Sequence, residues 1–168
     1  MGDRCFVRIR IGGEITPAGI EALLRANYSV QIELEEITHA ITTGTELDVE
    51  AEEVNYGNVE DIEEACKAHG LAYSIYTGEG DNYGAESKYW SPGMPETTYR
   101  DMTHDGDYAL TAGVLHNITK NETSKAKKFD AVLRWFCLKH DIPPLTHAPG
   151  CATDPSNEPT AQPPQNQP

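Results

Sequence analysis

Residues 4–11 are RCFVRIRI, and every second side chain from Cys5 to Ile11 is apolar. A period of two is typical of a β-strand that buries one face, because successive side chains point to opposite sides of a sheet. Gly12-Gly13 follows directly, and we expect this pair to end the strand. The chain is therefore predicted to begin with a half-buried strand.

Thr16 and Pro17 indicate where a first helix begins. A threonine side chain can accept a hydrogen bond from a free backbone N–H group at a helix start, and proline fits the first helical position. Apolar residues at Ile20, Leu23 and Leu24 then predict a short helix that ends near residue 27.

Patterns of apolar and polar residues that are typical of strands and helices continue to residue 77. We expect strands at 30–34, 47–52 and 71–77, and a helix between Asn58 and Gly70. The pattern leaves open what residues 37–43 form, although Gly44 is expected to end it. The order β-α-β-β-α-β predicts an α+β fold whose N-terminal half has the ferredoxin-like, split β-α-β arrangement.

The second half of the chain is expected to add a β-hairpin extension and C-terminal helices. We expect strands at 86–90 and 97–102, a short helix at 111–119 and a longer helix at 122–140. The longer helix has an apolar stripe that we expect to be buried: Phe129, Val132, Leu133, Phe136 and His140. The remaining residues are rich in Pro, Gln, Asn and Thr. We therefore expect a single domain over residues 1–142 and a disordered Pro-rich tail over residues 143–168.

The formal charge of −14 over 168 residues is concentrated in one block. Residues 26–66 contain twelve acids and no Lys or Arg. Direct nucleic-acid binding is not expected, because phosphate contacts require clustered Lys and Arg. The block is either a surface that meets a basic partner or a solvated face that this chain's own basic residues offset. The candidates for that offset are Lys125, Lys127, Lys128, Arg134 and Lys139.

Tyrosine and tryptophan gather after the acidic block, around Tyr89 and Trp90. Such a group is typical of the centre of a protein interface, and also of cross-strand packing in a hairpin. Together with the acids it gives our candidate partner-binding residues: Glu33, Glu35, Asp48, Glu50, Glu52, Glu53, Glu60, Asp61, Glu63, Glu64, Tyr89 and Trp90.

The four cysteines allow a second interpretation. Cys137, His140, His147 and Cys151 have the spacing C-x2-H-x6-H-x3-C, and thiolate and imidazole are the usual zinc ligands. The alternative function is therefore a zinc-stabilised structural or assembly protein. Cys5 and Cys66 are expected to be reduced core thiols.

No motif in the chain predicts catalysis. Cys66 and His69 lie near each other on one helix, and Asp105 and Asp107 could hold a divalent ion, but core packing and an Asp-Gly turn explain them more simply. We expect no enzyme activity and no cofactor. The N-terminus lacks the apolar block of a signal peptide and no apolar run could span a membrane, so a cytoplasmic location is expected.

Three short motifs carry a resemblance to known proteins: Tyr56-Gly57 before an acid-rich helix, HGLAY at 69–73, and Tyr89-Trp90 followed by Pro-Gly-Met at 92–94. Asp-Gly at 105–106 also fits. With these motifs the chain resembles a group of uncharacterised small acidic proteins of bacterial plasmids and phages. Such proteins often have Arg before the Pro-Gly-Met, where this chain has Ser91.

The resemblance implies a mobile-element origin, but it does not imply any particular activity. Together with the charge it suggests a non-enzymatic, acidic protein-binding module. Its expected role is to mimic nucleic acid and to inhibit a host DNA- or RNA-handling defence enzyme, of the anti-restriction or anti-CRISPR type. The expected partner is the basic surface of such an enzyme, with no membrane involved.

Overall fold

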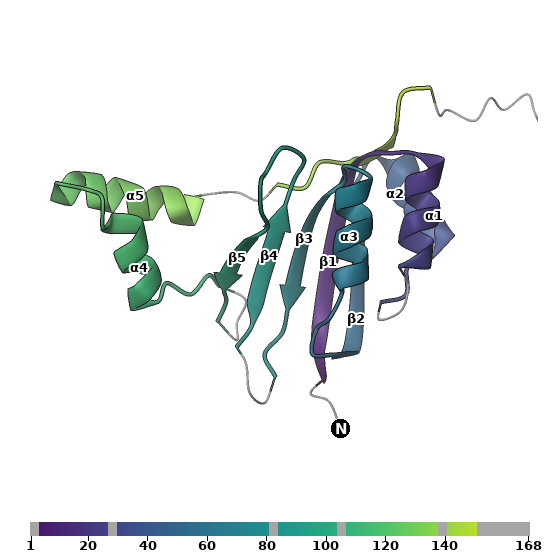
Figure 1. Ribbon diagram of the computed structural model, residues 1–168. Helices are drawn as coiled ribbons and strands as arrows, with labels where there is room; N and C mark the ends of the chain where they lie inside the picture. The colour runs from purple at the N-terminus through teal and green to yellow at the C-terminus, as the bar shows by residue number, and fades with distance from the viewer. Residues whose placement is uncertain (1–3, 27–29, 81–83, 104–106, 138–140, 151–168) are drawn as a thin grey trace, which may run out of the picture.

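The computed structural model describes residues 4–26, 30–80, 84–103, 107–137 and 141–150, which form six strands and five helices (Figure 1). In chain order these are β1 (Arg4–Ile15), α1 (Pro17–Arg25), α2 (Leu34–Thr43), β2 (Leu47–Asn55), α3 (Glu60–Ala68), β3 (Ala72–Thr77), β4 (Glu86–Trp90), β5 (Thr98–Asp101), α4 (Ala112–Thr119), α5 (Lys125–Cys137) and β6 (Leu145–His147). The predicted α+β class is confirmed.

The sheet has the strand order β2-β1-β3-β4-β5, and each of these strands is antiparallel to its neighbours. The alternation that predicted β1 also determines which face is buried. Val7, Ile9 and Ile11 are at most 1 % exposed. The polar residues between them point to the opposite face of the sheet, where the candidate acids of β2 also lie.

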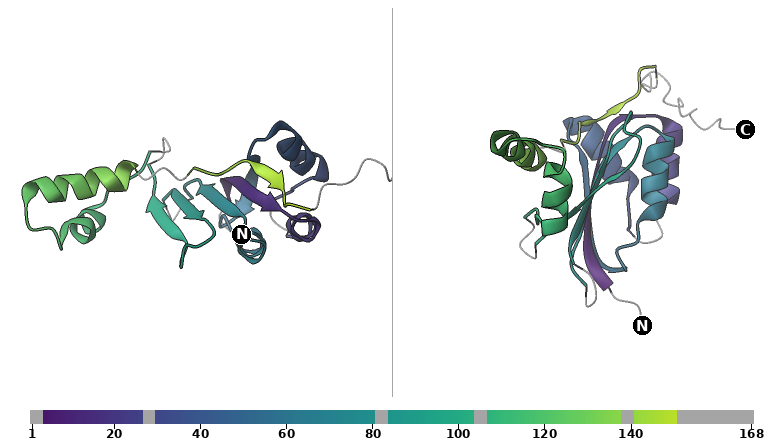
Figure 2. Two further views of the ribbon diagram at one scale, coloured as in Figure 1. Left: turned by 90° about the horizontal axis from the view of Figure 1, so that it is seen from above. Right: turned by 60° about the vertical axis from the view of Figure 1, so that its left-hand side comes forward.

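Helices α1 and α3 pack against each other on the face of the sheet that bears the apolar side chains (Figures 1 and 2). Helix α2 contacts α1, β2 and β6, so it lies at the β2 edge. Leu23 of α1, Ile37 of α2 and Ile62 of α3 are fully buried in the same core as β1.

Several local expectations are confirmed. The Thr16 hydroxyl accepts a hydrogen bond from the Gly19 N–H group at 3.1 Å, and Pro17 begins α1. Gly44 ends α2 with a left-handed φ of 66°. The strands expected at 47–52, 71–77, 86–90 and 97–102 correspond to β2, β3, β4 and β5. The short helix after Thr111 is α4, and its cap is the Thr111 hydroxyl.

The strand predicted over residues 30–34 is wrong. Leu34 instead begins α2, where the Glu36 carboxylate accepts a hydrogen bond from the backbone N–H group of Glu33 at 2.9 Å. This contact satisfies a backbone donor at the helix start, and Ile37 and Ala40 supply the buried stripe. The N-terminal order is therefore β-α-α-β-α-β, and the ferredoxin-like arrangement is not confirmed.

Gly12-Gly13 does not end β1, which continues to Ile15. The last three residues of β1 pair in parallel with β6, and Leu145 is fully buried there. Part of the segment that we expected to be disordered from residue 143 is therefore a strand of the fold. Residues 151–168 lie outside the described residues.

Helices α4 and α5 contact each other and project from the β5 end of the sheet (Figures 1 and 2). We name this pair of helices, residues 112–137, the arm. The expected burial of the α5 stripe is wrong for two of its members, because Phe129 is 63 % exposed and Leu133 is 43 % exposed. The side chains of Phe136 and His140 lie outside the described part.

Among the described residues, no helix is both long enough and apolar enough to cross a membrane.

Candidate protein-binding surface

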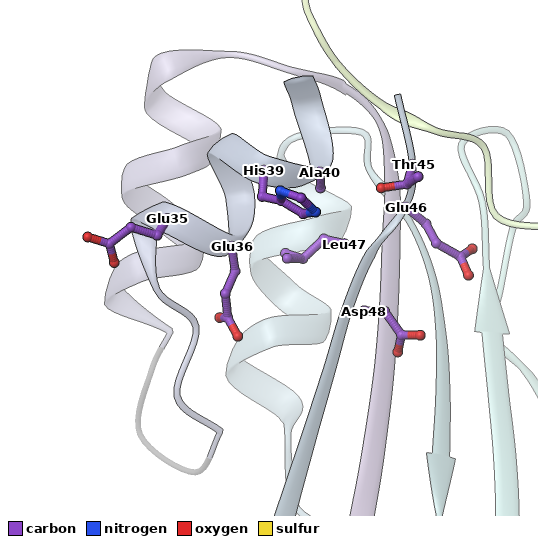
Figure 3. Close-up of a pocket in the computed structure, with 8 residues that line it drawn as sticks. All are labelled: Glu35, Glu36, His39, Ala40, Thr45, Glu46, Leu47 and Asp48. Carbon is purple, nitrogen blue, oxygen red and sulfur yellow. The ribbon is translucent and has the colours of Figure 1, made fainter. Parts of the chain in front are cut away.

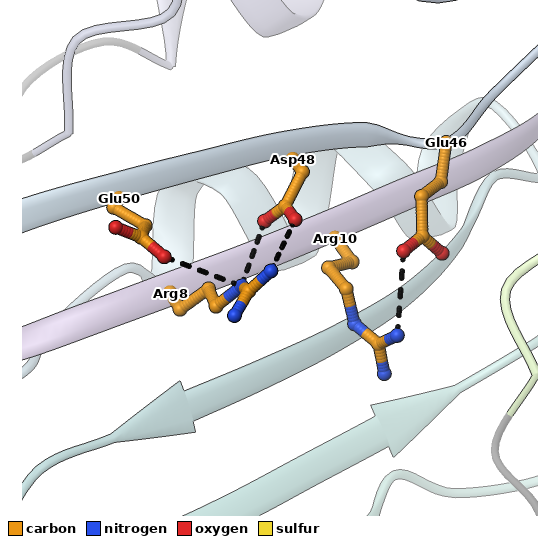
Figure 4. A network of polar contacts seen from close by, with 5 residues as sticks. All are labelled: Arg8, Arg10, Glu46, Asp48 and Glu50. Atoms are coloured by element: carbon orange, nitrogen blue, oxygen red, sulfur yellow. Dashed lines mark hydrogen bonds and ion pairs between the residues drawn. The ribbon is translucent and has the colours of Figure 1, made fainter.

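Arginines of β1 lie opposite acids of β2 on the face of the sheet away from α1 and α3. The Arg8 guanidinium donates to both carboxylate oxygens of Asp48, with Nε to Oδ1 at 2.9 Å, and it also lies 3.4 Å from Glu50 (Figure 4). Arg10 pairs with Glu46 at 3.3 Å. The antiparallel register places Arg8 opposite Glu50 and Arg10 opposite Asp48. Each arginine therefore reaches diagonally to the acid two residues before the one that it faces.

Arg4 pairs with Glu53 at 2.8 Å where the register between the two strands shifts, and Glu53 has a left-handed φ of 59°. The cations that offset the acids of β2 therefore come from β1 within the described residues. The sequence had suggested α5, but Arg134 of that helix lies beside Glu122, at 4.0 Å.

A groove of about 430 Å³ lies between α2 and β2. Ala40 and Leu47 lie at its base and are each only 2 % exposed, and the His39 ring lies over Leu47 (Figure 3). Four acids contribute to its lining: Glu35 and Glu36 of α2, Glu46, and Asp48 of β2. The Glu35 carboxylate points away from β2 and those of Glu46 and Asp48 point away from α2, so these three lie at the rim (Figure 3). We name it the acidic groove. A second hollow of about 400 Å³ lies beside it on α2 and shares Glu35 and His39. That hollow also includes Leu34, which is 53 % exposed.

The carboxylates of the acidic groove differ in how far they are neutralised. Glu46 and Asp48 have arginine partners, whereas Glu35 and Glu36 are exposed and make no ion pair within the described chain. Both lie in the first turn of α2, where the helix dipole favours negative charge. The groove therefore keeps a net negative charge despite the arginines of β1.

Other candidate acids lie outside this groove. Glu33 and Glu52 are exposed, and Glu60, Asp61 and Glu64 occupy the start of α3. The Asn58 side chain accepts a hydrogen bond from the Glu60 N–H group at 3.1 Å. The helix dipole stabilises carboxylates at this end too, so their position alone does not require a partner.

Glu63 is buried, which removes it from the candidate surface. It is 6 % exposed, and its carboxylate accepts hydrogen bonds from Lys88 Nζ at 2.9 Å and from the Tyr73 hydroxyl at 3.0 Å. The Tyr73 hydroxyl also lies 2.9 Å from the Thr97 hydroxyl. Burial opposes the charge of Lys88, but its hydrogen bond and attraction to Glu63 outweigh this and raise its pKa. A polar pocket of about 360 Å³ adjoins the ion pair, with Tyr99 among its walls.

Tyr89 and Trp90 are half-buried in β4. The Trp90 ring stacks on Tyr73, with centroids 6.1 Å apart, and its Nε1 donates to the Met94 carbonyl at 3.2 Å. Tyr89 lies opposite Ser74 of β3, on the other face. The hairpin-packing interpretation therefore fits Trp90 better than an interface anchor.

Three of the four proposed zinc ligands are not described: His140, Cys151 and the side chain of Cys137. His147 is exposed in β6. No group of three metal-ligating side chains occurs among the described residues. The zinc alternative stays a prediction.

The remaining candidate residues are placed as follows. Cys5 and Cys66 are buried free thiols, as expected. Burial, and secondly the charge of Glu63, raise the pKa of Cys66 to about 12, which leaves it protonated at neutral pH. Asp107 is exposed, and Asp105 lies outside the described residues.

Four residues of this surface were not predicted as site residues: Arg8, Arg10, Glu36 and Glu46. The arginines could have been found, since they alternate with the apolar residues of β1 just as Asp48 and Glu50 do in β2. Glu36 enters the groove only because α2 is a helix.

No family model, no curated protein and no solved structure matches this chain, and the resemblance to plasmid and phage proteins stays a prediction.

Proposed function

We propose that this protein is a non-enzymatic binding module that receives a basic segment of a partner protein in its acidic groove. The observation that carries this proposal is the groove between α2 and β2, whose lining includes four acids. Of these carboxylates, Glu35 and Glu36 make no ion pair in the described chain. A lysine- or arginine-rich segment would supply the missing positive charge.

The charge of the whole chain supports the same partner chemistry. A formal charge of −14 attracts basic proteins over distances of about one Debye length, roughly 8–10 Å at physiological salt. Such attraction mainly increases the rate of association. The groove then provides the local contact that long-range attraction alone lacks.

The partner that best fits this chemistry is a nucleic-acid-handling enzyme, whose basic track normally holds phosphates. A protein that occupies this track with carboxylates would mimic nucleic acid and inhibit the enzyme. Such mimicry, together with the resemblance to mobile-element proteins, supports a role against a host defence enzyme in the cytoplasm.

The first test is binding of the full chain to a labelled lysine-rich helical peptide, followed by fluorescence anisotropy at 50 and 300 mM salt. We expect binding at low salt that weakens at high salt. The charge reversal E35K/E36K should weaken it about tenfold or more, since each reversal replaces an attraction with a repulsion. The matched control E96K/D107K makes the same charge change at two exposed acids outside the groove.

If both double variants weaken binding equally, only the overall charge matters and the groove is not the site. If the wild-type chain binds the lysine-rich peptide no better than a glutamate-rich one, the proposal is wrong. The enzyme class is then tested by recovering the proteins that bind this chain from cytosolic extract at both salt concentrations. A nucleic-acid-handling partner should be displaced by a DNA oligonucleotide added as competitor.

A further inference from the structure

The arm exposes apolar side chains that an isolated domain would bury. Leu115 of α4 is 41 % exposed, and Phe129 and Leu133 of α5 are 63 % and 43 % exposed. Phe129 and Leu133 are four residues apart, so they lie on one face of α5. Ala131, on the opposite side of the helix, is buried. Phe129 and Leu133 are therefore turned toward solvent.

The arm is also basic, in a chain that is acidic overall. Residues 112–137 contain five Lys or Arg and two acids, which gives the arm a charge of +3. Residues 26–66 carry a charge of −12. Lys125 and Lys128 occur just before the apolar pair on α5 and are exposed. Exposed apolar side chains next to lysines are complementary to the groove's edge on α2, where the exposed Leu34 precedes Glu35 and Glu36.

The arm and the acidic groove lie at opposite ends of the molecule. The groove is formed at β2, one edge strand, whereas the arm follows β5, the other edge strand. Figures 1 and 2 show the arm directed away from α2 and β2. On the β5 side, Trp135 of α5 lies against Arg100 of β5, with the guanidinium 4.9 Å from the ring centroid. The arm therefore does not fill the groove of its own chain.

We propose that the arm of one copy docks in the acidic groove of a second copy of this chain. Phe129 and Leu133 then cover Leu34, which is 53 % exposed beside the groove, and Lys125 and Lys128 meet Glu35 and Glu36. This inference rests on the acidic groove of the proposed function and names a further ligand for it. Because each copy has one arm and one groove, the contact can be repeated from copy to copy in an open chain, or it can close in a ring or in a dimer that exchanges arms.

Analytical ultracentrifugation of the full chain tests this at 50 and 500 mM salt. We expect concentration-dependent dimers and longer assemblies at low salt, and dissociation at high salt. Two variants each block one half of the contact: F129S/L133S for the arm and E35K/E36K for the groove. Both pairs are exposed. Since E36K also removes the hydrogen bond that starts α2, circular dichroism must show that E35K/E36K keeps its helix content, and Glu35→Lys alone serves as a groove variant that leaves this bond in place.

Each blocked variant alone should be monomeric. Mixed together they should form a one-to-one dimer and nothing larger, because only one intact arm and one intact groove remain. Wild-type chain that stays monomeric at about 100 μM in low salt would overturn the inference. Assembly that F129S/L133S abolishes but E35K/E36K leaves intact would show that arm pairs with arm, which also overturns it.

The arm variant separates this inference from the proposed function. F129S/L133S keeps an intact, free groove, so it should bind the lysine-rich peptide at least as well as the wild-type chain. Peptide binding without self-association would contradict only the further inference. If the wild-type chain self-associates but F129S/L133S does not bind the lysine-rich peptide, only the proposed function is contradicted.

Discussion

Arg8 of β1 holds Asp48 of β2 through both of its carboxylate oxygens, on the face of the sheet that α1 and α3 leave uncovered (Figure 4). Asp48 is also a wall of the acidic groove. One arginine therefore reduces the negative charge that the groove presents. The acidity of this surface depends on ion pairs inside the chain as well as on the number of acids.

Replacing Arg8 should strengthen the binding of basic ligands. The substitution Arg8→Gln frees Asp48 and Glu50, so a lysine-rich peptide should bind several-fold more tightly at low salt. An exposed ion pair contributes about 0.2–1 kcal/mol, so the free energy of unfolding should fall by no more than that. The matched control is Arg25→Gln, which frees Glu21 within α1 instead. Equal gains in both variants would show that only net charge matters.

The ion pair between Glu63 and Lys88 should matter more to stability than those of β1. Their side chains are 8 % and 22 % exposed, so water screens the pair little. Lys88→Met leaves a buried carboxylate without its cation and should cost about 3 kcal/mol in urea unfolding. The double variant Glu63→Leu/Lys88→Met should be more stable than Lys88→Met, because no charge remains to be buried. A double variant less stable than the single one would contradict this account.

Stability should decrease above about pH 9. Burial raises the pKa of Cys66 from 9.0 to about 12, and burial also raises the pKa of Tyr73 above its ordinary value. The pKa of Lys88 is raised as well. Each group therefore holds its proton more tightly in the folded state. The unfolded chain releases protons first as the pH rises, which favours unfolding.

As the pH rises, Cys66 is the first of the three groups to lower the stability, because its pKa in the unfolded chain is lower than those of Tyr73 and Lys88. Each proton released on unfolding lowers the free energy of unfolding by about 1.4 kcal/mol per pH unit. Urea unfolding of the wild-type chain and Cys66→Ala at pH 7–11 measures the difference. The variant should lose stability more slowly between pH 9 and 10, and parallel curves would refute the assignment to Cys66.

Local patterns predicted the elements whose signals lie within a few residues. The alternation in β1, the Thr16-Pro17 helix start and the stop at Gly44 all appear in the structure. Helix α2 was missed because Val30, Ile32 and Leu34 alternate as a strand would. The contact between Glu36 and the Glu33 backbone that starts the helix involves an unusual capping residue.

The parts that could not be predicted depend on contacts distant in sequence. β6 has three residues in a Pro-rich segment, and it is a strand because Gly13–Ile15 of β1 offer a free edge. The exposure of Phe129 and Leu133 on α5 also depends on which distant segments pack against the helix. A helical period shows which residues share a face, but not whether a partner in the same chain covers that face.

The close approach of β6 to Gly12 predicts the effect of adding one methyl group. A Cβ at Gly12 would overlap the backbone oxygen of Pro143, so the segment before β6 must move. Gly12→Ala should cost about 1–3 kcal/mol, as overpacking does. It should also expose Leu145, whose N–H group donates to Thr45 at 2.8 Å. Hydrogen exchange of residues 141–150 measures this. Gly113→Ala, which meets no atom within 4 Å, is the control and should leave that exchange unchanged.

Arg100 should determine how firmly the arm is held. The side chain is 4 % exposed, and its guanidinium lies 4.7 Å from the centroid of Tyr108 and 4.9 Å from that of Trp135. Within the described structure, these two ring faces are the contacts seen for its charge. Arg100→Lys keeps the charge but loses the planar group that stacks on both rings. A cation–π contact contributes about 0.5–2 kcal/mol, so amides of α5 should exchange about 2- to 30-fold faster, while those of β1 stay unchanged.

The control variant Arg134→Lys makes the same change at an exposed position of α5. Exchange that is equally slow in all three proteins would show that the arm is held by other contacts.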